Sequence, residues 1–167
     1  MATIEWDEAI SGPLLEGEGE EILFTLAGEA VADIAGLLRA ETEARAPGGV
    51  TGALRGSIVS EVRGGTVDEL QGEVFSRSPY AAAVEEGRAP GSFPPWRPGT
   101  PLHAWVRRRI GVADREAGRV SYLVARAISR RGAPGRHMFR DALAASRGRI
   151  EERVRRLGEE IARALGG

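Results

Sequence analysis

The spacing of apolar residues predicts one long helix in the first third of the chain. From residue 22 onward, apolar side chains recur at intervals of three and four, which places them along one face of a helix. Acidic residues stand just before this stripe and favour a helical first turn. Pro47-Gly48-Gly49 cannot continue a helix, so the helix is predicted to end near Arg45. The stripe consists of Ile22, Leu26, Ala30, Ile34, Leu37 and Leu38.

A β region is predicted after this helix. Residues 57–63 are rich in β-branched side chains and partly alternate, which indicates a strand. Gly64-Gly65 forms a turn, and residues 69–76 read as a second strand. Because a two-stranded hairpin is unstable alone, we expect it to pack against the long helix.

The second half of the chain is predicted to be helical after a loop over residues 87–101, which holds five prolines and three glycines. Thr100 is a plausible cap and Pro101 a first residue for the next helix. The expected fold class is therefore α+β: a long N-terminal helix packed on a small antiparallel sheet, followed by a helical C-terminal half. The predicted helices carry Leu102, Trp105, Val106 and Ile110, then Ala117, Val120, Val124, Ala127 and Ile128, then Met138, Ala142, Leu143, Ile150, Val154, Leu157, Ile161 and Leu165.

The chain of 167 residues is long enough for one domain with its own core. Turn signals and acidic residues near the start predict an extended acidic arm over residues 1–20. A single α+β domain is expected over residues 21–167.

The first residues lack the apolar segment of a secretory signal. The apolar runs of the chain are shorter than the roughly 20 residues that span a bilayer. We therefore expect folding in a cytoplasm and no membrane partner.

Charge is divided unevenly along the sequence. Residues 1–96 hold six arginines and 17 acids, a net charge of -11, whereas residues 97–167 hold 17 arginines and seven acids, a net charge of +10. Such a division indicates either a nucleic-acid surface or an acidic face that meets the basic face of the next copy. A head-to-tail contact of the second kind builds a ring when its rotation closes.

Composition argues against most catalytic chemistry. Cysteine is absent and only two histidines are present, which excludes thiolate and multi-histidine metal sites. Ser57, Ser60 and Ser92 lack the motif of an activated nucleophile, and without lysine there is no phosphate-binding loop. We therefore expect no catalytic residue, no metal and no cofactor, although a hydrolase with an unrecognised site remains an alternative.

Arginines near the C-terminus leave a DNA-binding alternative open. Arg107-Arg108-Arg109 and the arginines at 153, 155 and 156 supply positive charge for phosphates. Nearby glutamates supply opposite charge, and three consecutive arginines spread around a helix instead of forming one stripe.

The loop aromatics Phe93 and Trp96 have two equally weighted interpretations, an exposed contact element or a plug that folds back on the core.

Three stretches, taken in order, resemble the neck or minor tail components of long-tailed bacteriophages. The likeness runs from about residue 22 to residue 160. The family often has an aromatic residue and Gly-Thr after its glutamate, where this chain has Glu86-Gly87-Arg88. The stretches are Thr51-Gly52-Ala53-Leu54-Arg55-Gly56-Ser57-Ile58, then Tyr80-Ala81-Ala82-Ala83-Val84-Glu85-Glu86-Gly87, then Trp105-Val106 with Gly111.

The resemblance implies a structural virion protein and not an enzyme. It implies a head–tail joining, tail-completion or tail-terminator role in a siphovirus-like phage, as a ring of about six copies around the DNA channel. Implied partners are copies of itself, head-closure and tail-tube proteins, and packaged DNA touched without sequence preference. Such a protein is made in the bacterial host cytoplasm and ends in the virion. The residues that carry the motif are Thr51, Gly52, Leu54, Arg55, Ile58, Tyr80, Glu85, Gly87 and Trp105.

These motif residues also have physical interpretations. Gly52 permits a tight turn into the strand, and Leu54 and Ile58 are expected in the core. Arg55 is expected to pair with Glu85. The acidic residues 1–21 of one copy are expected to meet an arginine-rich C-terminal face of the next, in a contact that salt weakens. The candidate interface residues are Glu18, Glu20, Glu21, Phe93, Trp96, Arg107, Arg108, Arg153 and Arg156.

Overall fold

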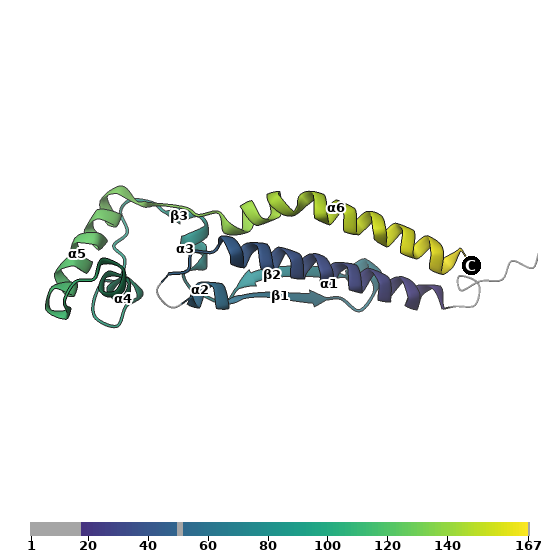
Figure 1. Cartoon of the computed structure of the whole chain (residues 1–167), viewed down its shortest axis with the longest axis horizontal. Helices are drawn as coiled ribbons and strands as arrows, with labels where there is room; N and C mark the ends of the chain where they lie inside the picture. The colour runs from purple at the N-terminus through teal and green to yellow at the C-terminus, as the bar shows by residue number, and fades with distance from the viewer. Residues whose placement is uncertain (1–17, 50–51, 167) are drawn as a thin grey trace, which may run out of the picture. The chain divides into compact units, whose positions relative to one another are not determined.

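The computed structural model describes residues 18–49 and 52–166 and has an α+β fold (Figure 1). It contains a long N-terminal helix, a two-stranded antiparallel sheet and a helical C-terminal half, as the sequence predicts. The elements are α1 (Gly19–Arg45), α2 (Ala53–Gly56), β1 (Ile58–Arg63), η1 (Val67–Glu69), β2 (Gln71–Ser76), α3 (Ala81–Glu85), β3 (Gly87–Arg88), α4 (Pro101–Trp105), η2 (Val106–Ile110), α5 (Asp114–Arg131), β4 (Ala133–Pro134) and α6 (Met138–Leu165).

Two compact units share the chain, and their segments interleave in sequence. Within the described residues, unit 1 consists of residues 18–37, 61–73 and 147–166, and unit 2 consists of residues 38–49, 52–60 and 74–146. The single domain expected over residues 21–167 therefore contains both units. Of the arm expected over residues 1–20, residues 1–17 lie outside the described residues, and α1 begins at Gly19.

In unit 1, α1 lies between α6 and the sheet (Figure 1). Small residues allow the sheet to approach α1 closely. A Cβ atom added to Gly72 of β2 would lie 3.0 Å from Val31 Cγ1 and 3.4 Å from Ala35 Cβ. Ala35 is only 3% exposed, so its methyl group forms part of this contact. Ala30, earlier on α1, is also buried, at 1% exposure. The helix-on-sheet packing expected for a two-stranded hairpin is thus present.

In unit 2, the core gathers residues from five elements and one connection. Burying these side chains against one another supplies the main stabilisation of the unit. Ile58 at the start of β1 and Met138 at the start of α6 are 1% and 0% exposed. The core consists of Ala46, Leu54, Ile58, Ala81 and Met138, with Val74, Val84 and Phe139 packed against it.

A second, very short sheet joins the start of the predicted loop to the segment before α6. β3 pairs antiparallel with β4, Gly87 opposite Pro134 and Arg88 opposite Ala133. The N–H of Gly91 then donates to the carbonyl of Ser129 at 2.7 Å. This sheet, α2 and α3 were not predictable from the sequence, because two to five residues are too few to form a periodic pattern.

Helix α4 begins where the sequence predicts, but the helices that follow it partly bury other faces than expected. The Thr100 hydroxyl accepts from the N–H of His103 at 3.4 Å, and Pro101 is the first residue of α4. In α5 the fully buried residues are Ala117, Ser121 and Ala125, whereas Ala127, expected in the core, is exposed. Small side chains face inward on α5 because they allow closer helix packing. On α6, the predicted core residues Leu143 and Val154 are each 53% exposed.

Candidate functional site

The first motif builds a turn and part of the unit 2 core. Thr51 lies outside the described residues. Gly52 has a φ of 69° at the start of α2, a left-handed conformation that glycine adopts without steric cost. Leu54 and Ile58 are buried, as expected. The Arg55 Nε–H donates to the carbonyl of Ala46 at 2.7 Å, which ties α2 to the end of α1.

Glu85 has a different partner from the one expected. Among the described residues it forms no ion pair with Arg55; its carboxylate accepts instead from the backbone N–H groups of Phe139 and Arg140, each at 3.1 Å. These N–H groups belong to the first turn of α6, where helical hydrogen bonding leaves donors unpaired and where a negative charge is favoured. Glu85 therefore caps α6, a role that adjacent sequence could not indicate.

The other motif residues also serve the backbone framework. A Cβ atom on Gly87 would lie 2.5 Å from the carbonyl oxygen of Ala133, and Gly87 has a φ of 82°. Only glycine fits this close strand contact without rearrangement. Tyr80 precedes α3 and is 37% exposed, and Trp105 at the end of α4 is 38% exposed. Both aromatic side chains thus remain accessible at their surfaces.

The proline-rich loop packs on α5 through its aromatic residues. The rings of Phe93 and Trp96 lie 5.8 Å and 5.3 Å from the Tyr122 ring, centroid to centroid. The Arg97 guanidinium lies 5.8 Å from the centre of the Trp96 ring, within the range of a cation–π contact. Phe93 is nevertheless 44% exposed and Tyr122 40%. The loop thus combines both interpretations, since it folds onto α5 and still presents aromatic surface.

The expected interface residues differ in how many intrachain partners they have. Glu18, Glu20 and Glu21 are exposed at the start of α1, and Glu20 and Glu21 form no ion pair within the described part of the chain. Arg107 pairs with Asp114 at 2.5 Å, and both line a surface pocket together with Arg108. The charges at the start of α1 are therefore more available to a partner than that of Arg107.

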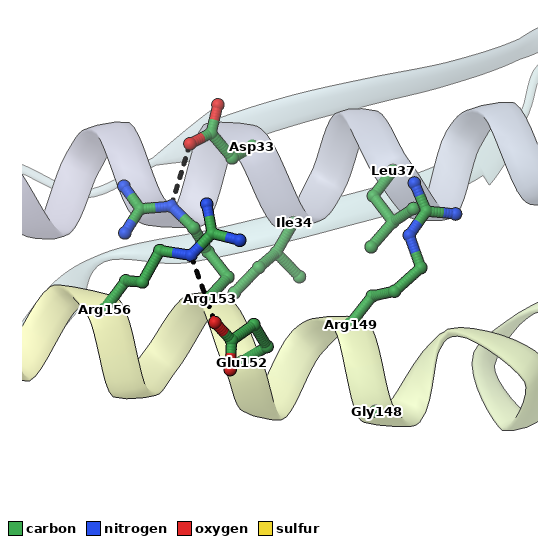
Figure 2. A pocket seen from close by; sticks show the side chains of 8 residues that line it. All are labelled: Asp33, Ile34, Leu37, Gly148, Arg149, Glu152, Arg153 and Arg156. Atoms are coloured by element: carbon green, nitrogen blue, oxygen red, sulfur yellow. Dashed lines mark hydrogen bonds and ion pairs between the residues drawn. The ribbon is translucent and has the colours of Figure 1, made fainter.

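A shallow groove in unit 1 lies between α1 and α6 and contains the remaining two expected residues (Figure 2). The Arg153 side chain is 15% exposed and bridges the helices, 2.8 Å from Asp33 of α1 and 3.2 Å from Glu160 of α6. The hydrogen bond that Arg153 donates to the Asp33 carboxylate raises the pKa of the Arg153 guanidinium above its ordinary value. Arg153 therefore holds two helices of its own chain together. The groove is lined by Asp33, Ile34, Leu37, Gly148, Arg149, Glu152, Arg153 and Arg156.

Most of the arginine charge on this part of α6 is neutralised by neighbouring glutamates. Glu152 lies 2.7 Å from Arg155 and 3.3 Å from Arg156, and Arg155 also pairs with Glu159. Hydrogen bonds from Arg155 and then Arg156 lower the pKa of the Glu152 carboxyl. Such paired arginines have less attraction for DNA phosphates than free ones, which weakens the DNA-binding alternative for α6.

Within the described residues, the potential metal ligands do not cluster, and the Ser57 hydroxyl is engaged with the backbone. No group of three histidine, aspartate or glutamate residues among them could hold a metal ion. The Ser57 hydroxyl donates to the carbonyl of Leu54 at 2.7 Å and shares a hydrogen bond with Ser76, so it lies in a backbone turn. His103 is buried in α4 at 9% exposure.

In the described parts of the chain, the helices lack a stretch both long and apolar enough to cross a membrane.

Comparisons with family models, with curated proteins and with solved structures found no match for this chain.

Proposed function

We propose that this chain is a structural subunit of a tailed phage particle, which joins head and tail or completes the tail. It assembles with copies of itself into a ring around the DNA channel and contacts neighbouring neck and tail proteins. The proposal rests on the motif resemblance, and the role of the motif residues in the fold supports it.

The structural observation that best supports the proposal is the position of the Glu85 carboxylate. In the second motif, the Glu85 carboxylate accepts hydrogen bonds from the backbone N–H groups of Phe139 and Arg140. Glu85 therefore stabilises the start of α6. Leu54 and Ile58 lie in the core, and Gly87 is required by a strand contact. Motif residues that stabilise the fold are typical of a protein that functions by binding other subunits and not by catalysing a reaction.

The division of charge between the two units also supports assembly. The described residues of unit 1 hold seven arginines and 13 acids, and those of unit 2 hold 16 arginines and seven acids. Their net charges are therefore -6 and +9. Complementary charge steers association and fixes the orientation of partners.

In vitro complementation tests the proposed function. The gene for this chain is deleted from a phage that carries it, and the lysate of the deletion phage is examined by electron microscopy. We expect DNA-filled heads and separate tails, or tails of abnormal length, and we expect purified protein to restore complete infectious particles. Normal tailed particles in the deletion lysate would contradict the proposal. A variant carrying Leu54→Asp, which places a charge in the core, serves as the inactive control.

A further inference from the structure

One face of α1 in unit 1 combines acidic and apolar side chains. Its members lie at relative positions i, i+3, i+4, i+7 and i+8, so they form one continuous stripe on the helix. Ile22 and Leu26 are only half-buried although both are aliphatic. Together with Ala164 they line a surface groove. The α1 face consists of Glu18, Glu21, Ile22, Thr25 and Leu26.

One face of α5 in unit 2 has the same spacing and the opposite charge. Leu123 is 48% exposed, and its neighbours on this face are exposed as well. These side chains also line a surface groove. The opposite side of the helix packs inward through Ala117, Ser121 and Ala125. The α5 face consists of Leu123, Arg126, Ala127, Arg130 and Arg131.

The charges of both faces lack partners within the described part of the chain. No ion pair there involves Glu21, Arg126, Arg130 or Arg131. The arginines of α6, in contrast, are largely paired with glutamates. The α1 and α5 faces thus differ from the rest of the charged surface because each has apolar contact area and unneutralised charge of one sign.

We propose that the α1 face of one copy docks on the α5 face of the next copy. Two glutamates would then meet three arginines around a small apolar centre of Ile22, Leu26 and Leu123. Both faces extend over nine residues of helix, about 12 Å at 1.5 Å per residue, so their lengths match. The occupant of each face is a second copy of this chain, because the negative charge of unit 1 complements the positive charge of unit 2.

This contact is heterologous when the two faces of one copy dock on two different neighbours. Repetition of such a contact closes into a ring when the rotation between copies allows it. The inference rests on the proposed function and specifies which surfaces form its ring. Exposed ion pairs are individually weak and are screened by salt, so assembly through this contact depends on protein concentration and falls at high ionic strength.

Paired charge reversals test this contact directly. Glu18→Arg with Glu21→Arg makes the α1 face basic, and Arg126→Glu with Arg130→Glu makes the α5 face acidic. Each double variant alone brings like charges together, so we expect self-association to weaken at least about tenfold in sedimentation velocity at low salt. An equal mixture of the two variants restores opposite charges at both kinds of contact, and we expect assembly to return.

A matched control separates this effect from a change in net charge. Arg109→Glu with Arg147→Glu alters the net charge as much as the α5 variant but touches neither face, and both arginines are exposed. We expect it to assemble like the wild type. Circular dichroism confirms that each variant is folded. Unchanged assembly of both face variants, or no recovery on mixing, would overturn the inference while leaving the proposed function to the complementation test.

The form of the assembly gives two further outcomes. A closed dimer that the face variants disrupt would support the contact but contradict the proposed ring. A wild-type protein that stays monomeric, and whose binding to duplex DNA is lost with Arg126→Glu and Arg130→Glu, would overturn the contact and assign the α5 face to DNA.

Discussion

The carboxylate of Glu85 accepts a hydrogen bond from the backbone N–H of Phe139, 54 positions further along the chain. A second bond from the N–H of Arg140 completes the cap. The end of α3 therefore stabilises the first turn of α6, the longest helix of the fold. One acid in the second motif links that motif to the last third of the protein.

Replacement of Glu85 tests this link. We expect Glu85→Ala to lower the free energy of unfolding by about 1–2 kcal/mol, because two N–H groups lose their acceptor and the first turn loses a negative charge. Glu85→Gln keeps an oxygen acceptor and is expected to lose less. Urea denaturation followed by circular dichroism measures both. Glu86→Ala, at an exposed neighbouring position, is the control, and an equal loss there would contradict the cap.

Gly87 and Gly118 form a matched pair of glycine substitutions. Gly87→Ala places a Cβ atom 2.5 Å from the Ala133 carbonyl at a φ of 82°, so we expect a loss of about 2–3 kcal/mol. Gly118 lies within α5 and a Cβ atom there meets nothing within 4 Å. Gly118→Ala is therefore expected to raise stability by roughly 0.5–1 kcal/mol. Thermal unfolding of the two variants side by side decides the matter, and a neutral Gly87→Ala would refute the close strand contact.

The bridge made by Arg153 predicts a contrast with Arg156. Arg153→Ala is expected to cost about 1–2 kcal/mol, because a largely covered side chain loses both packing and its pairs with Asp33 and Glu160. Arg156 is 59% exposed and Arg156→Ala is expected to change stability by less than about 0.5 kcal/mol. Chemical denaturation measures each. Equal effects of the two substitutions would show that Arg153 does not hold α1 to α6.

The lowered pKa of Glu152 predicts a pH-dependent contribution to stability. The folded state favours the ionised carboxylate, so the stabilisation is present above the ordinary pKa of 4.5 and is lost as the pH falls through the lower folded value. Glu152→Gln should therefore be less stable than the wild type at pH 7, and the difference should shrink to nothing in strong acid. Denaturation midpoints across this range measure it. The neighbouring exposed Glu151→Gln is the control and should show no such trend.

Local sequence was sufficient for the long elements and for the fold class. α1 ends at Arg45 as predicted, because a Pro-Gly-Gly segment follows the apolar stripe. The two long strands begin one and two residues later than expected. Leu54 and Ile58 were recognisable as core residues because they stand where a turn enters a strand. Periodicity and chain breakers act over a few residues, so a single sequence contains them.

Features that depend on distant residues could not be predicted in this way. The predicted Arg55–Glu85 pair was wrong because the opposite charges of two motifs do not indicate which backbone donors and acceptors the fold brings near them. The exposed positions of Ala127 and Val154 depend on which side of each helix meets its neighbours.

By itself, the sequence determined the long helices, the hairpin and the opposite charge of its two halves, since these follow from local spacing and composition. Only the tertiary structure decided which arginines are paired, what caps α6 and which faces of α1 and α5 remain uncovered. The physical reason is that burial and ion pairing depend on long-range packing, which joins residues that the chain holds far apart.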